Sequence, residues 1–205
     1  MREAEPLADL FELRLDVMTS WQLEEIISLA PKPVIITYRS RQQGGKGSND
    51  YTTHAQVLSE ALELGAEFID VEHTMPSDLR QKLFQGRGKS RVIISCHMLH
   101  ETPTRDALEK RFYRLAGMGA DIVKVVTHAN ALEDNLRILD LISCARDHGT
   151  PVITFCMGPL GRVSRVVSPI LGGFLTFASL TRGEESASGQ LTALEVKNLM
   201  KVLAP

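Results

Sequence analysis

A lysine inside a short apolar run is the residue of this 205-residue chain whose setting most favours chemistry. Lys124 is the only charged residue in the run IVKVVT, residues 122–127. An ammonium group in such a run is desolvated, paired or extended towards solvent. Desolvation and nearby cations lower a lysine pKa, and the neutral amine can then attack a carbonyl carbon to form a Schiff base. The pattern predicts an amine nucleophile, and the alternative is a lysine near a strand end that reaches solvent or a carboxylate.

A histidine ends another apolar run. His97 closes RVIISCH, residues 91–97, and a histidine titrates near neutral pH, which suits proton transfer. The alternative is a structural histidine with satisfied hydrogen bonds. Cys96 points to the opposite face of a strand, which argues against a Cys–His nucleophilic pair. His100 and Glu101 follow without a suitably spaced third ligand, so we expect no metal.

Two arginines close apolar segments of the chain. Arg39 follows the run at 34–38, and Arg165 follows a Gly-rich turn. A guanidinium can bind a carboxylate or a phosphate through two parallel hydrogen bonds. The two arginines are therefore candidates for anion capture, and the alternative for each is a surface ion pair.

Seven short runs rich in Val, Ile, Phe and Thr alternate with longer amphipathic stretches. Such runs are typical of buried strands, and strand–helix alternation predicts parallel strands joined by right-handed crossovers. The predicted strands are FELRLD (11–16), VIITYR (34–39), FIDVEH (68–73), RVIISCH (91–97), IVKVVT (122–127), PVITFC (151–156) and FLTFAS (174–179).

The amphipathic stretches carry signals of helix ends. Ser20 is a candidate N-cap for a helix within 20–30, and Thr53 with Gln56 is a candidate capping box for the next helix. Two longer helices are predicted over 104–117 and 132–149, and each ends at a glycine.

Charged residues on the predicted strands favour a closed barrel over an open doubly wound sheet. Glu12, Arg14 and Asp16 share one face of their strand, and Asp70 shares a face with Glu72. An open sheet covered by helices on both faces has no place for such charges. A barrel can direct them inward, near the rim where barrel enzymes have their active sites.

The count of strands is seven rather than eight. Ten residues precede Phe11, which is too few for another βα unit of about 25–30 residues. We therefore expect a single α/β domain over 1–205, a TIM-type (β/α)8 barrel that lacks its first βα unit.

The composition excludes several classes of protein. With 23 Lys and Arg against 25 Asp and Glu, the formal net charge of −2 argues against a nucleic-acid partner. The sequence contains no run of 18 apolar residues, so we expect no membrane helix. The first ten residues have no signal-peptide pattern, and we therefore expect a cytoplasmic protein. The three cysteines, expected to be reduced thiols, are Cys96, Cys144 and Cys156.

Motifs along nearly the whole chain resemble those of one family, the type I 3-dehydroquinate dehydratases of the shikimate pathway. The resemblance rests on six segments in the family's order. They are ELRLD (12–16), TYRS followed by GG (37–45), SCH before ETP (95–103), VKVV (123–126), GPLGRVSR (158–165) and TFASLTRGEESASGQL (176–191). The family fold is an (α/β)8 barrel, in agreement with the expectation from the strands.

The resemblance implies a role for each matching residue. Lys124 matches the Schiff-base lysine, and His97 matches the proton-transfer histidine. The small-molecule substrate would be 3-dehydroquinate, no cofactor is needed, and a homodimer is compatible with the family. The residues that match substrate-binding positions are Glu12, Arg14 and Arg39 in the pocket, Arg165 at the substrate carboxylate, and Ser186 and Gln190 in a loop over the site.

The chain also departs from the family pattern. Gln43 stands where the family usually has a glutamate hydrogen-bonded to the catalytic histidine, and Phe155 replaces one of two methionines near the lysine, leaving Met157. The loop proline is Ser188. Two alternatives stay open: an inactive or truncated paralogue, and another Schiff-base barrel of the class I aldolase type.

Overall fold

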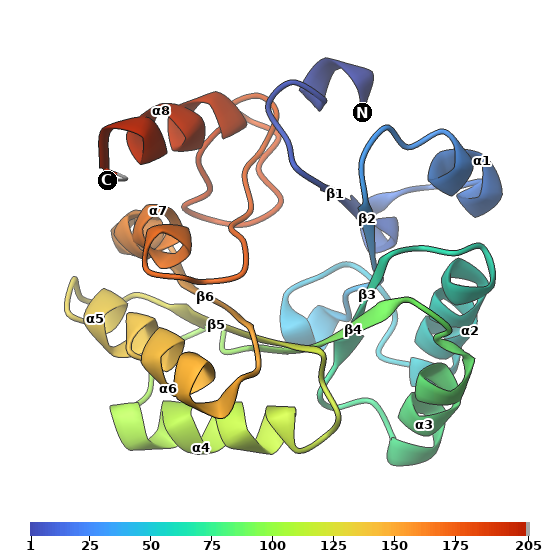
Figure 1. Ribbon diagram of the computed structural model, residues 1–205, viewed down its shortest axis with the longest axis horizontal. Helices are drawn as coiled ribbons and strands as arrows, with labels where there is room; N and C mark the ends of the chain where they lie inside the picture. Colours follow the sequence, from blue (N-terminus) through green and yellow to red (C-terminus); the bar gives the residue numbers. More distant parts are fainter. Residues whose placement is uncertain (204–205) are drawn as a thin grey trace. The chain divides into compact units, whose positions relative to one another are not determined.

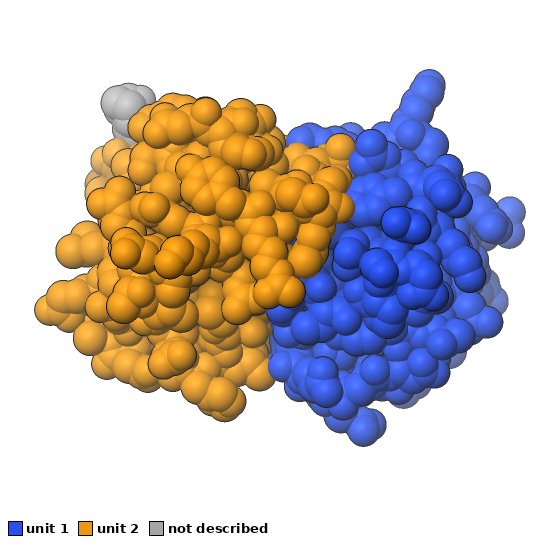
Figure 2. All heavy atoms as spheres, turned by 90° about the horizontal axis from the view of Figure 1, so that it is seen from below, with its two compact units in different colours: residues 1–95 blue, residues 96–205 orange. Residues whose placement is uncertain are grey.

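A computed structural model describes residues 1–203 of the chain. These residues divide into two compact units, which Figure 2 shows in different colours. Unit 1 is Met1–Ser95, and unit 2 begins at Cys96. The expectation of a single domain over 1–205 stays a prediction.

Unit 1 contains parallel strands that pair in chain order. They are β1 (Phe11–Arg14), β2 (Val34–Thr37), β3 (Phe68–Glu72) and β4 (Arg91–His97), whose last two residues belong to unit 2. Every residue of β2 and β3 is buried, as expected for strands covered on both faces.

Three helices of unit 1 follow β1, β2 and β3. They are α1 (Leu23–Ser28), α2 (Tyr51–Glu63) and α3 (Ser77–Gly86), and α2 lies beside α3 (Figure 1). Short 3-10 turns lie at Arg2–Ala4, Leu15–Val17 and Arg41–Gln43. The helix α2 buries Val57, Leu58, Ala61 and Leu62 along one face, which has the spacing of an amphipathic helix.

Both helix starts predicted in unit 1 are wrong. The N-cap of α2 is Asp50, whose carboxylate accepts a hydrogen bond from the Thr52 N–H at 3.0 Å, so Thr53 lies inside the helix. An aspartate is as good an N-cap as serine or threonine, and it comes first here. The residue before α1 is Gln22, two positions beyond Ser20.

Unit 2 contains β5 (Ile122–His128) and β6 (Val152–Met157), which pair in parallel with Lys124 opposite Ile153 and Val126 opposite Phe155. Figure 1 shows α4, α5 and α6 along one side of these strands. The helices of unit 2 are α4 (Arg105–Ala116), α5 (Asp134–Leu139), α6 (Leu141–His148), α7 (Arg162–Ile170) and α8 (Ala193–Leu203), with a 3-10 turn at Pro159–Gly161 before α7.

The single helix predicted over 132–149 is two helices. The carbonyl oxygen of Asp140 accepts hydrogen bonds from the main-chain N–H and the hydroxyl of Ser143. These bonds span three residues instead of four and interrupt the regular α-helical pattern between α5 and α6.

The predicted count of seven strands is also wrong, since the described residues form six. In the segment 174–179, Phe174 N–H donates to the Val152 carbonyl, and Ser179 forms an isolated bridge with Thr192. One hydrogen bond and one bridge do not make the repeated ladder of a strand. The α/β class with parallel strands is confirmed, and closure into a (β/α)8 barrel stays a prediction.

Candidate active site

The ten predicted site residues divide between the two units. Unit 1 carries Glu12, Arg14, Arg39 and Gln43, whereas unit 2 carries His97, Lys124, Met157, Arg165, Ser186 and Gln190.

In unit 1, Arg39 is the centre of a buried polar cluster. Its Nη2 lies 2.6 Å from Asp70 Oδ2, and its Nη1 lies 3.3 Å from Glu72 Oε1. Nη1 also donates to the Ser95 hydroxyl at 2.8 Å. The strand register explains this meeting, because Thr37 is opposite Asp70 and Glu72 is opposite Ser95, which brings Arg39 level with Glu72.

The two carboxylates decide what Arg39 can bind. Burial alone would lower the pKa of Arg39, but the negative charges of Asp70 and Glu72 raise it above its ordinary value. Arg39 is 3% exposed, so it does not form the surface ion pair that is the alternative. One positive charge against two negative charges leaves no attraction for an anion, so Arg39 is better suited to hydrogen-bond a neutral hydroxyl group.

Glu12 and Arg14 project from β1 close to the same strand ends. Glu12 accepts a hydrogen bond from the Thr37 hydroxyl at 3.0 Å. Arg14 donates from Nε and Nη2 to the two oxygens of Asp16, each at 2.8 Å. Burial opposes ionisation of Asp16, but the bonds from Arg14 and the Lys46 N–H hold the pKa of Asp16 below its ordinary value. These residues therefore offer a charged, hydrogen-bonding wall.

Gln43 is buried in a tight turn after β2. Its main-chain N–H donates to the carbonyl and the hydroxyl oxygen of Ser40. The turn needs small residues, because a Cβ atom at Gly45 would be 2.2 Å from the Arg39 carbonyl oxygen. At Gly47 the distance to the same oxygen would be 2.6 Å. Both distances are well below ordinary contact, so the two glycines allow the turn to fold back on Arg39.

In unit 2, two buried cations lie against two aromatic rings. Lys124 Nζ is 4.4 Å from the centre of the Phe177 ring, and Arg165 Cζ is 4.4 Å from the centre of the Phe155 ring. The two rings meet edge to face with centres 6.1 Å apart. Lys124 is 4% exposed and Arg165 is 1% exposed. The lysine is thus held inside the unit rather than extended to solvent, and the two rings of the pair link it to the arginine.

Arg165 differs from Arg39 in having no acidic partner. Among residues 1–203 no carboxylate forms an ion pair with it, and its buried Nε has no hydrogen-bond partner. Its Nη2 donates to the Ser188 carbonyl at 3.2 Å. Burial lowers the pKa of Arg165 to about 10. A buried, uncompensated guanidinium with a spare donor is suited to receive an anion.

His97 is the last residue of β4 and is half-buried. The next residue, Met98, donates from its N–H to the Val126 carbonyl at 2.8 Å, which places this end of β4 two residues beyond Lys124 on β5. Met157 ends β6 opposite His128, on the same strand face as Phe155. The histidine therefore lies at the end of β4, where barrel enzymes carry catalytic groups, and the lysine lies inside β5, two residues before the level of that end.

The predicted loop over the site packs against the start of α7. Gln190 is buried, and its Oε1 accepts from the main-chain N–H of Ser186 at 2.9 Å and from the Ser186 hydroxyl at 3.3 Å. The Ser188 carbonyl accepts from Arg165 and from the Gly158 N–H. A surface pocket of about 540 Å³ is lined by Arg162 and residues 185–190. The loop thus contacts the guanidinium that we expect to bind substrate.

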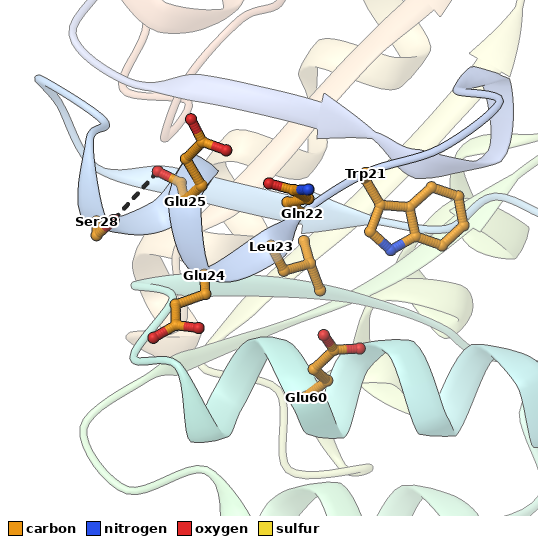
Figure 3. Close-up of a pocket in the computed structure, with 7 residues that line it drawn as sticks. All are labelled: Trp21, Gln22, Leu23, Glu24, Glu25, Ser28 and Glu60. Carbon is orange, nitrogen blue, oxygen red and sulfur yellow. Dashed lines mark hydrogen bonds between the residues drawn. The ribbon is translucent and has the colours of Figure 1, made fainter.

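Another pocket, of about 510 Å³, lies between α1 and α2 (Figure 3). Glu24 and Glu25 come from α1, Glu60 comes from α2, and Trp21 closes one side. Three carboxylates repel an acidic substrate, so this pocket is a poor candidate for the active site.

Several residues of these clusters were not predicted as site residues. The sequence places Asp70 and Glu72 on one strand face, and their alternation in a buried strand is the signal that points to them. Ser95 gave no signal, because a serine in an apolar strand is common. Within residues 1–203 no group of three or more His, Cys, Asp or Glu side chains is arranged to hold a metal, and no helix is long and apolar enough to cross a membrane.

Comparison with known proteins identifies relatives of the whole described chain. The family model for type I 3-dehydroquinase matches residues 1–204. A 3-dehydroquinate dehydratase of Thermococcus onnurineus is 37% identical over 199 residues, which cover 96% of this chain and 88% of that protein. The crystal structure of a type I 3-dehydroquinate dehydratase from Clostridium difficile, with covalently modified comenic acid, aligns with a TM-score of 0.86 at 26% identity. That alignment covers 98% of this chain and 85% of the other.

A longer relative matches over one part of its length. The bifunctional 3-dehydroquinate dehydratase/shikimate dehydrogenase of Arabidopsis thaliana is 36% identical over 197 residues, which cover 94% of this chain and 32% of that protein. The chain therefore spans about a third of the plant protein. The resemblance inferred from the motifs is confirmed, and so is the enzyme class that it implied, a hydro-lyase.

Proposed function

Because the chain belongs to the type I 3-dehydroquinase family, we propose that it dehydrates 3-dehydroquinate to 3-dehydroshikimate through an imine at Lys124, with His97 as general acid and base. The substrate is a cyclic hydroxyketone acid, so a site for it needs an amine near the ketone and a cation for the carboxylate.

The observation that carries the proposal is the arrangement of Lys124 and Arg165 in unit 2. Lys124 lies over the Phe177 ring and Arg165 over the Phe155 ring of one edge-to-face pair, and both side chains are nearly fully buried. Arg165 has no carboxylate partner among the described residues, whereas Arg39 has two. The substrate carboxylate is therefore better matched to Arg165, and the ketone to Lys124.

The reaction then follows from the properties of these groups. The neutral amine of Lys124 attacks the C3 carbonyl carbon, and loss of water gives an iminium ion. His97 removes a proton from C2, and the electron pair moves towards the iminium nitrogen, which acts as an electron sink. The eneamine then expels the C1 hydroxyl, which leaves as water after receiving a proton from His97. Hydrolysis of the iminium releases the product and restores the amine.

The other predicted residues have supporting roles in this proposal. Glu12, Arg14 and Arg39, which match the family's pocket residues in the motifs, bind the substrate hydroxyls in this proposal, and the two carboxylates beside Arg39 support that task. Ser186 and Gln190 belong to a loop that excludes water while the iminium exists. The remaining supporting residues are Gln43, in the position of the family glutamate, and Met157, on the strand face next to Phe155.

Trapping of the imine tests the proposal. The protein is incubated with 3-dehydroquinate and borohydride, digested and analysed by mass spectrometry, while turnover is followed by the ultraviolet absorbance of the conjugated enone acid. We expect a reduced adduct on Lys124 and none in Lys124→Ala. The matched control is Lys110→Ala, an exposed position on α4, which should trap and turn over normally. An adduct on another lysine, or turnover without Lys124, would contradict the assignment.

A further inference from the structure

A tyrosine from the first turn of α2 reaches the polar cluster of unit 1. The hydroxyl of Tyr51 donates to Glu72 Oε2 at 2.9 Å and also contacts the hydroxyl of Thr74. Tyr51 is half-buried, with its ring edge to face against His54, whose Nε2 lies 2.7 Å from the Ser48 carbonyl oxygen. Burial and the Glu72 carboxylate raise the pKa of Tyr51, so the phenol keeps its proton and stays a donor.

Each oxygen of the Glu72 carboxylate, which accepts this bond, has two hydrogen-bond donors. Glu72 is 1% exposed. Its Oε1 accepts from the Ser40 N–H at 2.8 Å and from Arg39 Nη1 at 3.3 Å. Its Oε2 accepts from the Ser40 hydroxyl at 2.7 Å and from Tyr51. Four donors fix the plane of the carboxylate, and among the donor residues Tyr51 alone comes from a helix, since Arg39 and Ser40 lie just after β2.

The orientation of Glu72 matters for Arg39. The contact between Arg39 and Glu72 is longer than the contacts of the same guanidinium with Asp70 and Ser95. It is therefore the contact most easily lost if the carboxylate turns. Asp70 and Ser95 would still hold Arg39, so loss of the Tyr51 bond should loosen the guanidinium without releasing it.

We propose that Tyr51 is a positioning residue, whose hydroxyl holds Glu72 so that the Arg39 guanidinium keeps one orientation for substrate binding. The inference rests on the proposed function in one respect, the assignment of Arg39 to a substrate hydroxyl. It goes beyond that function by giving α2 a part in substrate affinity, through a side chain that does not touch the substrate.

The test is Tyr51→Phe, which keeps the ring against His54 and removes the hydroxyl. We expect KM for 3-dehydroquinate to rise about three- to tenfold and kcat to stay within about twofold, because one hydrogen bond that orients a binding group is lost. The matched control is Tyr113→Phe, the same change on α4, which should alter neither constant. The Tyr113 ring packs edge to face against Phe112 and His148.

A second measurement reports on Arg39 without turnover. In protein with 15N-labelled arginine, the restricted guanidinium of Arg39 should give separate Nη signals, assigned by their loss in Arg39→Lys. In Tyr51→Phe these signals should broaden or merge. A merely structural role would lower the melting temperature and leave KM and the Arg39 signals unchanged, which would overturn the proposal. If the unmodified protein shows no turnover, the proposed function fails, and the Arg39 signals still decide the role of Tyr51.

Discussion

The Arg165→Met variant should be more stable than the unmodified protein but less active, so it separates the effect of Arg165 on stability from its effect on substrate binding. Burial lowers the pKa of Arg165 from its ordinary value to about 10. At about 1.4 kcal/mol per pKa unit, this difference disfavours the charged side chain in the folded protein by about 3 kcal/mol. Because the folded pKa lies below the unfolded pKa, the penalty is fully present below about pH 10 and is lost as the pH rises towards the unfolded pKa. At neutral pH the free protein is therefore destabilised by this residue.

Two favourable contacts reduce the penalty. The guanidinium lies against the Phe155 ring and donates to the Ser188 carbonyl, and each contact contributes about 1 kcal/mol. Arg165→Met should therefore raise the free energy of unfolding by about 1 kcal/mol, or about 2–4 °C in melting temperature for a chain of this size. The same change should lower kcat/KM by about 30-fold or more, because loss of one partner of a buried charge pair costs at least about 2 kcal/mol.

Arg39→Met is the matched control, because it makes the same chemical change beside two carboxylates. It leaves Asp70 and Glu72 buried without their cation, which should cost about 3–5 kcal/mol. Urea unfolding gives the stability of both variants, and the dehydratase assay gives kcat/KM. If Arg165→Met is destabilised as strongly as Arg39→Met, or if it retains kcat/KM within about threefold, Arg165 is not an uncompensated cation that binds the substrate carboxylate.

Substitutions at His97, Gly45 and Asp50 test a catalytic role, a tight turn and a helix cap. His97→Ala should lower kcat about 100-fold or more and change KM little, because a proton-transfer group acts in the transition state. Changes of equal size in kcat and KM would exclude proton transfer as the role of His97. Gly45→Ala should lower stability by more than about 1 kcal/mol through a clash with the main chain, whereas Gly86→Ala, with open space around it, should not. In urea unfolding, Asp50→Ala should cost about 1 kcal/mol and Thr53→Ala much less; the reverse order would favour the capping box.

The strands were the part of the fold most open to prediction. Buried parallel strands carry continuous apolar runs, and the run at 91–97 coincides with β4. The segment 174–179 has the same composition without the repeated pairing of a strand. Its sequence could not reveal this, because a strand is defined by its partners as well as by its residues. Helix starts failed for a related reason, since Asp50, Thr53 and Ser20 all satisfy the local pattern of an N-cap.

The contrast between Arg39 and Arg165 shows where sequence reasoning stops. Each arginine closes an apolar segment, so the sequence predicted anion capture for both. The register of β2 on β3 places Arg39 beside Glu72, and the alternation of side chains along β3 brings Asp70 to the same face. Arg165 lies on α7, beside Phe155 on β6, where none of residues 1–203 pairs a carboxylate with it. Which carboxylates lie beside an arginine depends on the pairing of segments that are distant in the sequence. Arg39 and Arg165 therefore have similar local sequences, but among the described residues only Arg165 of the two is left without a carboxylate and suited to bind an anion.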